Sequence, residues 1–173
     1  MDVDELQHAL GGVVLESAYL ERVLRAAFSA LIDSKYAAVV DSRLTAATMI
    51  EDCERITRHH TDIPGAEKER LLAALTACHQ ANSHRNRVIH DAWATRPGDV
   101  MVTLHGSPNA RDVTVIVRTP GEVRQVAERL ADAANDVKAA MTAAFGPEWD
   151  LVEDQLRHEL GRDAGAEGQR ADE

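Results

Sequence analysis

The chain has 173 residues, of which 45% are hydrophobic and only 3% are aromatic, and its formal net charge is −10. This length is typical of one domain with enough interior to fold unaided, and Ala and Leu, which are strong helix formers, supply much of the apolar content. A charge of −10 argues against broad, non-specific binding of nucleic acids.

The charge is distributed unevenly along the chain. Residues 147–173 carry nine acidic residues and three arginines, a net charge of −6, which leaves −4 for residues 1–146. Residues 82–118 contain five arginines and three aspartates. That stretch is locally positive, so a site for RNA is compatible with the composition.

Three helices are predicted in the first half of the chain. Apolar residues recur at three- and four-residue steps over residues 3–32, which predicts one long amphipathic helix. A second helix is predicted over residues 44–59. Residues 61–65 include a Pro-Gly pair that interrupts the pattern, and a third helix is predicted from about Ala66 to His90.

The apolar pattern changes after the third helix. Residues 100–104 and residues 113–118 alternate with a period of two, and a stretch rich in Gly, Ser, Pro and Asn separates them. This combination predicts a β-hairpin over about residues 100–118. A two-stranded hairpin is only marginally stable by itself, so we expect it to pack on the helices or to pair with another chain.

A fourth helix is predicted after the hairpin. Its start is marked by Thr119 as the cap, Pro120 at the first helical position and Glu122 three residues after the cap. An apolar stripe then continues to about Phe145, where a Gly-Pro pair ends the helix.

These elements predict a mainly α fold. We expect an antiparallel four-helix-type bundle with a β-hairpin inserted before the last long helix, because helices joined by short connections pack antiparallel to each other. The bundle is predicted to occupy residues 1–146. Residues 147–160 are predicted to form a short acidic amphipathic segment, and residues 161–173 a disordered acidic tail.

The sequence gives no support for a metal, a cofactor or a membrane span. Cys53 and Cys78 have no metal-ligand spacing and are interpreted as small buried hydrophobic residues. His59 and His60 are adjacent, so they cannot share a helical face, and no metal site is expected. There is no signal-peptide pattern and no run of about 20 apolar residues, so we expect a cytoplasmic protein without membrane contact.

Arg85, Asn86 and His90 are the most informative residues of the chain. Asn86 and His90 are four residues apart and share a helical face, and the long Arg85 side chain can bend toward them. An arginine can hold a phosphate, an amide can orient it, and a histidine with a pKa of about 6.5 can move a proton near neutral pH. Together they predict a catalytic site for RNA cleavage. The plainer alternatives are a surface ion pair for Arg85, and a polar surface residue or an amide that supports the helix end for Asn86. For His90 the alternative is a helix-terminal histidine satisfied by a neighbouring carbonyl or by Asp91.

This stretch resembles the signature of the HEPN superfamily, the higher eukaryote and prokaryote nucleotide-binding domains. In that family an Arg is followed by four to six residues and then a His, often with Asn directly after the Arg. Here Arg85 and His90 enclose four residues, Asn86 follows the Arg, and Asp91-Ala92-Trp93 is similar to the continuation in bacterial members. The resemblance covers about residues 1–145. It implies a helical bundle, a homodimer that joins two motifs in one cleft and, in many members, metal-independent RNase activity, whereas other members are inactive binding or scaffold domains.

Five further residues are candidates around the motif. The resemblance implies that the first helix packs near the motif helix, so Glu21, or else Glu16, is a possible partner of the arginines; exposed helix charges are the alternative. Arg87 and His84 flank the motif as candidates for RNA binding, with solvated side chains or contacts across a dimer as the alternative. Trp93 is a candidate for stacking on a base, with a core or interface anchor as the alternative.

The sequence thus predicts a HEPN-like ribonuclease that cleaves RNA by metal-independent transesterification. The resemblance suggests a bacterial toxin–antitoxin or defence system, in which an antitoxin protein is the partner. The alternative is a non-catalytic HEPN-like module that binds a partner protein or a nucleotide, which the net charge of −10 favours. A third alternative is a helical protein of unrelated function in which the motif is accidental.

Overall fold

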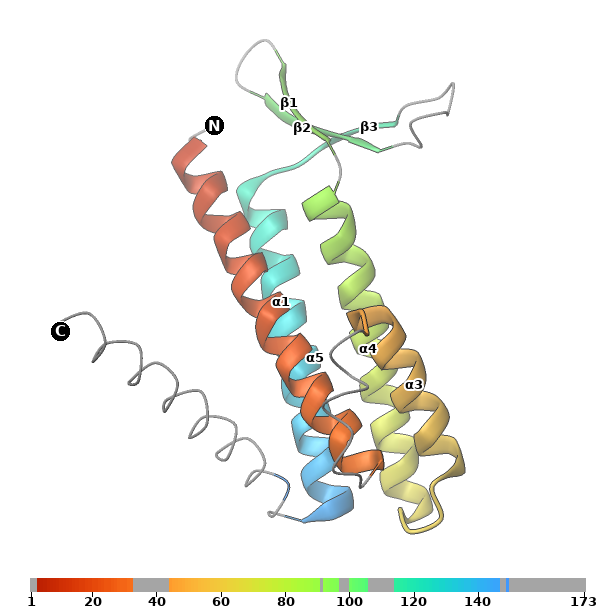
Figure 1. Ribbon diagram of the computed structural model, residues 1–173. Coiled ribbons are helices and arrows are strands. Elements are labelled where there is room, and N and C mark those ends of the chain that lie inside the picture. Colours follow the sequence, from red (N-terminus) through yellow and green to blue (C-terminus); the bar gives the residue numbers. More distant parts are fainter. Residues whose placement is uncertain are drawn as a thin grey trace, which may run out of the picture.

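The computed structural model describes residues 3–32, 44–90, 92–96, 100–105, 114–146 and 149. Within this part of the chain there are four helices, as predicted (Figure 1). Their bounds are α1 (Val3–Ile32), α3 (Ala46–His59), α4 (Gly65–His90) and α5 (Pro120–Phe145). The observed starts and ends lie within two residues of the predicted ones, because helical periodicity and cap residues are local signals.

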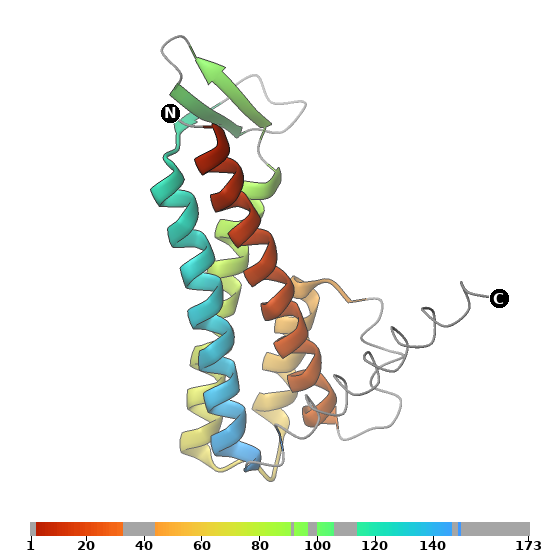
Figure 2. The same ribbon diagram turned by 90° about the vertical axis from the view of Figure 1, so that its left-hand side faces the viewer.

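The helices form a bundle in which α1 and α4 each pack along both α3 and α5. Three of the four helices run in the same direction. Glu5 and Arg124, which lie near the starts of α1 and α5, form an ion pair of 2.6 Å, so these two helices are parallel. α3 runs the same way as α1, and α4 is the one helix among the four that runs against the others (Figures 1 and 2). The prediction of an antiparallel bundle is therefore wrong.

The connection between α1 and α3 explains this difference. The prediction assumed short connections, but residues 33–43 can span up to about 36 Å when extended. That reach allows α3 to begin beside the middle of α1 rather than beside its end. Accordingly, Thr45 at the start of α3 lines the same cavity as Glu21, which lies well before the end of α1.

A small β-sheet occupies the end of the bundle where α4 ends and α5 begins (Figure 1). It consists of β1 (Ala92–Arg96), β2 (Val100–His105) and β3 (Thr114–Val117), in the order β1-β2-β3 with antiparallel neighbours. The prediction of a two-stranded hairpin as the inserted unit is wrong, because β1 pairs with β2 from Ala92↔Leu104 to Arg96↔Val100. Sequence reasoning missed β1 because its five residues follow the helix almost directly and have no alternating pattern.

The core lies along the centre of the bundle and draws on all four helices. Its largest fully buried side chains include Leu20 and Leu24 of α1, Met49 and Ile50 of α3, Leu71 and Leu75 of α4, and Leu130 and Met141 of α5. Cys53 and Cys78 are free and buried in this core, which confirms their interpretation as small buried hydrophobic residues.

Two predicted segments follow α5. The amphipathic segment 147–160 lies outside the described residues except for Trp149, which is buried, and the tail 161–173 lies outside them altogether. Within the described residues, no helix combines the length and the apolar character that crossing a bilayer requires.

Candidate functional site

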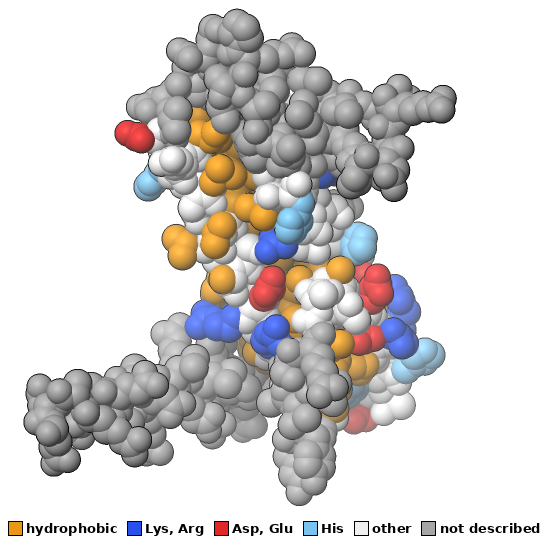
Figure 3. Space-filling view, turned by 45° about the horizontal axis from the view of Figure 1, so that its top comes forward, with side chains coloured by type: hydrophobic (Ala, Val, Ile, Leu, Met, Phe, Trp, Pro, Cys, Tyr) orange, Lys and Arg blue, Asp and Glu red, His pale blue; other side chains and the backbone are white. Residues whose placement is uncertain are grey.

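A cavity of about 410 Å³ lies between the last turns of α4, the first turn of α3 and α1. Four residues singled out in the sequence line it: Glu21 from α1, and Arg85, Asn86 and His90 from α4. The structure therefore brings the three motif residues and the preferred acidic candidate together. The space-filling view in Figure 3 shows basic, acidic and histidine side chains close together on one face, beside hydrophobic ones.

The Arg85 guanidinium is held in place from two sides. Its Nη1 donates a hydrogen bond of 2.9 Å to Oδ1 of Asn86, and its Nη2 lies 4.0 Å from Oε1 of Glu21. Arg85 is only 25% exposed, and its buried Nε has no hydrogen-bond partner in the part of the chain that the structure describes. Because a distance of 4.0 Å is too long for a hydrogen bond, the contact with Asn86 does more than Glu21 to orient the guanidinium.

The first turn of α3 forms another part of the cavity wall. Thr45, Ala46 and Ala47 all line it. Thr45 is the N-cap of α3, and its side chain accepts a hydrogen bond of 3.2 Å from the backbone N–H of Thr48. The other N–H groups of a first helical turn have no partner within the helix, and the helix dipole makes this end attractive to anions. Arg85 and the start of α3 therefore both favour a bound anion in the same cavity.

Sequence reasoning missed this wall because it depends on how two helices pack. The capping pattern at Thr45 could have located the start of the helix, but nothing local to residues 45–47 indicates that they face Arg85. Asn82 was also missed, and it is a buried polar residue with 7% exposure that lines the cavity. Its spacing gave a usable signal, because Asn82, Asn86 and His90 follow one another at four-residue steps and share a face of α4.

Three other candidates lie outside this cavity. Glu16 is half-buried on α1, five residues before Glu21, and does not line the cavity. His84 and Arg87 lie on the side of α4 that faces α5, where they line a different hollow. Trp93 belongs to β1, and its side chain lies outside what the structure describes.

The described residues contain no group of three or more His, Cys, Asp or Glu side chains that could hold a metal ion. Comparison of the chain with protein-family models, with curated proteins and with solved structures finds no match. The relation to HEPN proteins therefore rests on the motif residues Arg85, Asn86 and His90 and stays a prediction.

Proposed function

We propose that the cavity at Arg85 is the active site of a HEPN-like ribonuclease that cleaves RNA by transesterification without a metal ion. The observation that carries this proposal is the convergence of Glu21, Arg85, Asn86, His90 and the first turn of α3 on one cavity. A guanidinium and a helix N-terminus supply attraction for a phosphate, and an imidazole beside them supplies a group that moves protons near neutral pH.

The reaction assigns a role to each of these groups. The 2′-oxygen of the RNA forms a bond to phosphorus while the bond from phosphorus to the 5′-oxygen breaks. His90, in its neutral form, accepts the proton of the 2′-hydroxyl, and an imidazolium donates a proton to the departing 5′-oxygen. Arg85 neutralises the charge that develops on the phosphate, and Asn86 and Glu21 keep the guanidinium oriented. The products are a 2′,3′-cyclic phosphate and a 5′-hydroxyl.

The proposal also includes a second histidine, which donates the proton to the departing 5′-oxygen, and a biological role. A two-fold dimer supplies the second histidine, because it places two copies of the motif at one cleft. The role in a bacterial toxin–antitoxin or defence system, with an antitoxin protein as partner, rests on the motif resemblance alone.

The experiment compares the full chain with single variants on a labelled RNA in the presence of EDTA. Cleavage should persist in EDTA, yield cyclic-phosphate ends and leave DNA intact, since DNA has no 2′-hydroxyl. His90→Ala should lower the rate by about 10²–10⁴-fold, the usual contribution of general acid–base catalysis. Arg85→Lys should also be damaging, because an ammonium cannot replace the planar two-donor fork.

The matched control is His79→Ala. His79 is an exposed histidine on the same helix, 11 residues before His90 and therefore about 16 Å away along the helix axis. This variant should keep full activity. Cleavage of DNA, a requirement for a divalent metal or full activity in His90→Ala would contradict the proposed mechanism. If the wild-type chain cleaves no RNA, the non-catalytic binding module is the better reading, and the existing contact of Arg85 with Asn86 then has a structural role.

A further inference from the structure

A second polar cluster lies on the side of α4 that faces α5. At about 100° per residue, His84 lies roughly 160° and Arg87 roughly 100° around the helix from the centre of the face that carries Asn82, Asn86 and His90. They line a hollow of about 280 Å³ between α4 and α5, together with Arg118 and Arg129. We call these four residues, His84, Arg87, Arg118 and Arg129, the basic cluster.

The charge of the basic cluster is unusual for this chain. Three guanidiniums meet at one hollow in a protein whose net charge is −10. Glu122 is the one carboxylate among the lining residues that the structure describes, and its Oε2 already accepts hydrogen bonds of 2.7 and 3.2 Å from the backbone N and the Oγ1 of Thr119. The formal charges of these described lining residues, three arginines and one glutamate with His84 neutral, sum to about +2, and a positive hollow attracts a phosphate.

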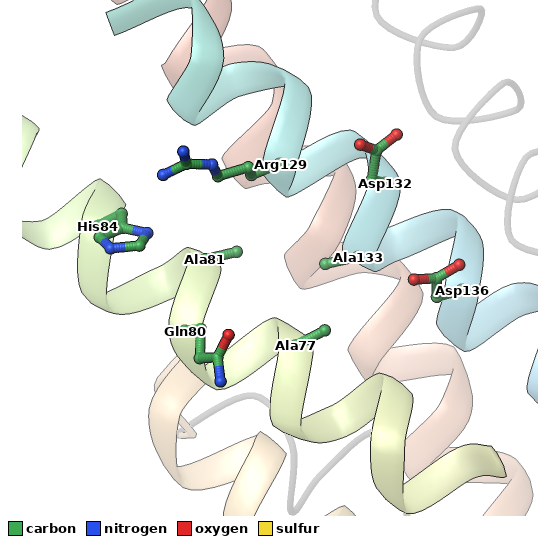
Figure 4. Close-up of a pocket in the computed structure, with 8 residues that line it drawn as sticks. All are labelled: Ala77, Gln80, Ala81, His84, Arg129, Asp132, Ala133 and Asp136. Atoms are coloured by element: carbon green, nitrogen blue, oxygen red, sulfur yellow. The ribbon is translucent and has the colours of Figure 1, made fainter. Parts of the chain in front are cut away.

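Two arginines of the cluster are available to a ligand. Arg87 and Arg129 are exposed, and within the described part of the chain neither forms an ion pair. Figure 4 shows Arg129 extending from α5 toward His84 on α4, whereas the carboxylate of Asp132 points away from α4. The Nδ1 atom of His84 is buried and has no hydrogen-bond partner among the described residues. Buried polar atoms are nearly always paired, so this atom marks a place where a partner is missing.

We propose that the basic cluster binds the phosphate group of a small phosphorylated molecule. Guanidiniums pair with phosphate oxygens through two parallel hydrogen bonds, and the imidazole of His84 adds a further polar contact. A volume of about 280 Å³ lies just below the range for small-molecule pockets, about 300–1,000 Å³, so the ligand is compact. This site is separate from the cavity at Arg85 and does not depend on ribonuclease activity.

The state of His84 agrees with this assignment. Burial lowers the pKa of His84 below its ordinary value of 6.5, and Arg87, Arg129 and Arg118 lower it further. The charged groups around the ring are Arg87 on α4, Arg118 before α5, and Glu122, Arg129, Asp132 and Asp136 on α5. A bound dianion would offset the arginines and therefore raise the pKa of His84.

The test is an NMR titration of the full chain that follows the histidine ring signals, with His84 assigned by loss of its signal in His84→Gln. The probes are inorganic phosphate, adenosine monophosphate, adenosine and a short RNA without a terminal phosphate, all at constant ionic strength set by chloride. Phosphate and adenosine monophosphate should shift the His84 signals to saturation and raise the pKa of His84, while adenosine should not. Tighter binding of adenosine monophosphate than of phosphate would identify a nucleotide as the source of the phosphate group, and equal binding would identify free phosphate.

Arg87→Gln and Arg129→Gln should each weaken phosphate binding about tenfold or more, because each removes a charge-assisted pair of hydrogen bonds. Both residues are exposed, so the fold should be retained, which circular dichroism checks. Arg70→Gln is the matched control, since Arg70 is an exposed arginine on α4 outside the cluster. The Arg70→Gln variant should bind phosphate as tightly as the wild type does. The proposal is overturned if phosphate leaves His84 unchanged, if Arg70→Gln weakens binding as much as the other two, or if only the RNA without a terminal phosphate binds.

Discussion

At the scale of single residues, the period of α4 determines which surroundings each polar side chain meets. Asn82, Asn86 and His90 share one face and line the cavity with Glu21, whereas His84 and Arg87 face α5. The grouping of Asn86 with His90 follows from their spacing alone. The separation of Arg87 from Arg85 also follows from the helical period. The residues that surround Arg87 come partly from α5, however, and the local sequence around the motif does not reveal that α5 packs there.

The two thiols allow a prediction about chemical reactivity. Burial raises the pKa of Cys53 and that of Cys78 to about 12, with Asp52 and Asp136 adding to the respective shifts. The reactive thiolate is therefore scarce at pH 8, and both side chains are fully buried. In the native protein neither thiol should react with a disulfide reagent on the time scale of mixing, and both should react at once in denaturant.

Absorbance of the released thiol reports this reaction directly. The rate in the native state should depend on conditions that open the fold, such as low concentrations of denaturant, because labelling requires opening. A single thiol that reacts rapidly in the folded protein would contradict the burial of that cysteine. Cys78 also donates a hydrogen bond of 3.6 Å from its Sγ to the carbonyl oxygen of Ala133 on α5, which ties α4 to α5 at this point.

At the scale of the elements, the start of α5 has a complete capping box. The Oγ1 of Thr119 accepts a hydrogen bond of 3.2 Å from the backbone N of Glu122, and the backbone N of Thr119 donates one of 2.7 Å to the Glu122 side chain. We predict that Thr119→Ala lowers the free energy of unfolding by about 1 kcal/mol, since the loss of a Thr cap typically costs 0.5–2 kcal/mol. Urea denaturation followed by circular dichroism measures the change.

Thr142→Ala is the control for this measurement. Thr142 is exposed near the other end of α5, and its backbone carbonyl, which accepts a hydrogen bond from Gly146, is kept in the variant. Ala has the higher helix propensity, so this variant should be as stable as the wild type or slightly more stable. Equal losses of stability in the two variants would show that the cap at Thr119 has no special role.

The elements also show what a single sequence can and cannot reveal. The helices could be predicted because apolar spacing and the signals at Thr119 and Gly146 are local. The alternation of period two located β2 and β3, but β1 has no such pattern and is defined by its pairing with β2. The direction of α3 could not be predicted either, because packing against α1 and α4, rather than the residues of α3, determines it.

The candidate site could be predicted only in the part that lies on one helix. Arg85, Asn86 and His90 belong to one helix, so their proximity follows from the sequence. Glu21 was chosen by resemblance, and the structure places its carboxylate 4.0 Å from Arg85. The contribution of the first turn of α3 could not be inferred, because it depends on the long connection before Thr45 and on the packing of the whole bundle.

At the scale of the whole molecule, we predict a homodimer. The motif resemblance implies one, and α1 has two exposed large hydrophobic side chains, Val14 at 56% and Leu15 at 71% exposure. Sedimentation equilibrium at micromolar concentration should give about twice the chain mass of 18.9 kDa. A monomer at the highest soluble concentration would remove the two-motif cleft and, with it, the source of the second histidine in the proposed reaction.

The parallel pairing of α1 with α5 has a consequence for how the chain folds during synthesis. The two helices pack along each other, yet 87 residues separate Ile32 from Pro120. At about 5–20 residues per second, the ribosome begins α5 roughly 4 to 17 seconds after it completes α1. During that interval the part of its apolar stripe that packs against α5 has no native neighbour, although α3 is already made. The α5-facing side of the N-terminal helix is therefore exposed to chaperones and to misassembly for several seconds, and its docking must wait for the last helix to be made.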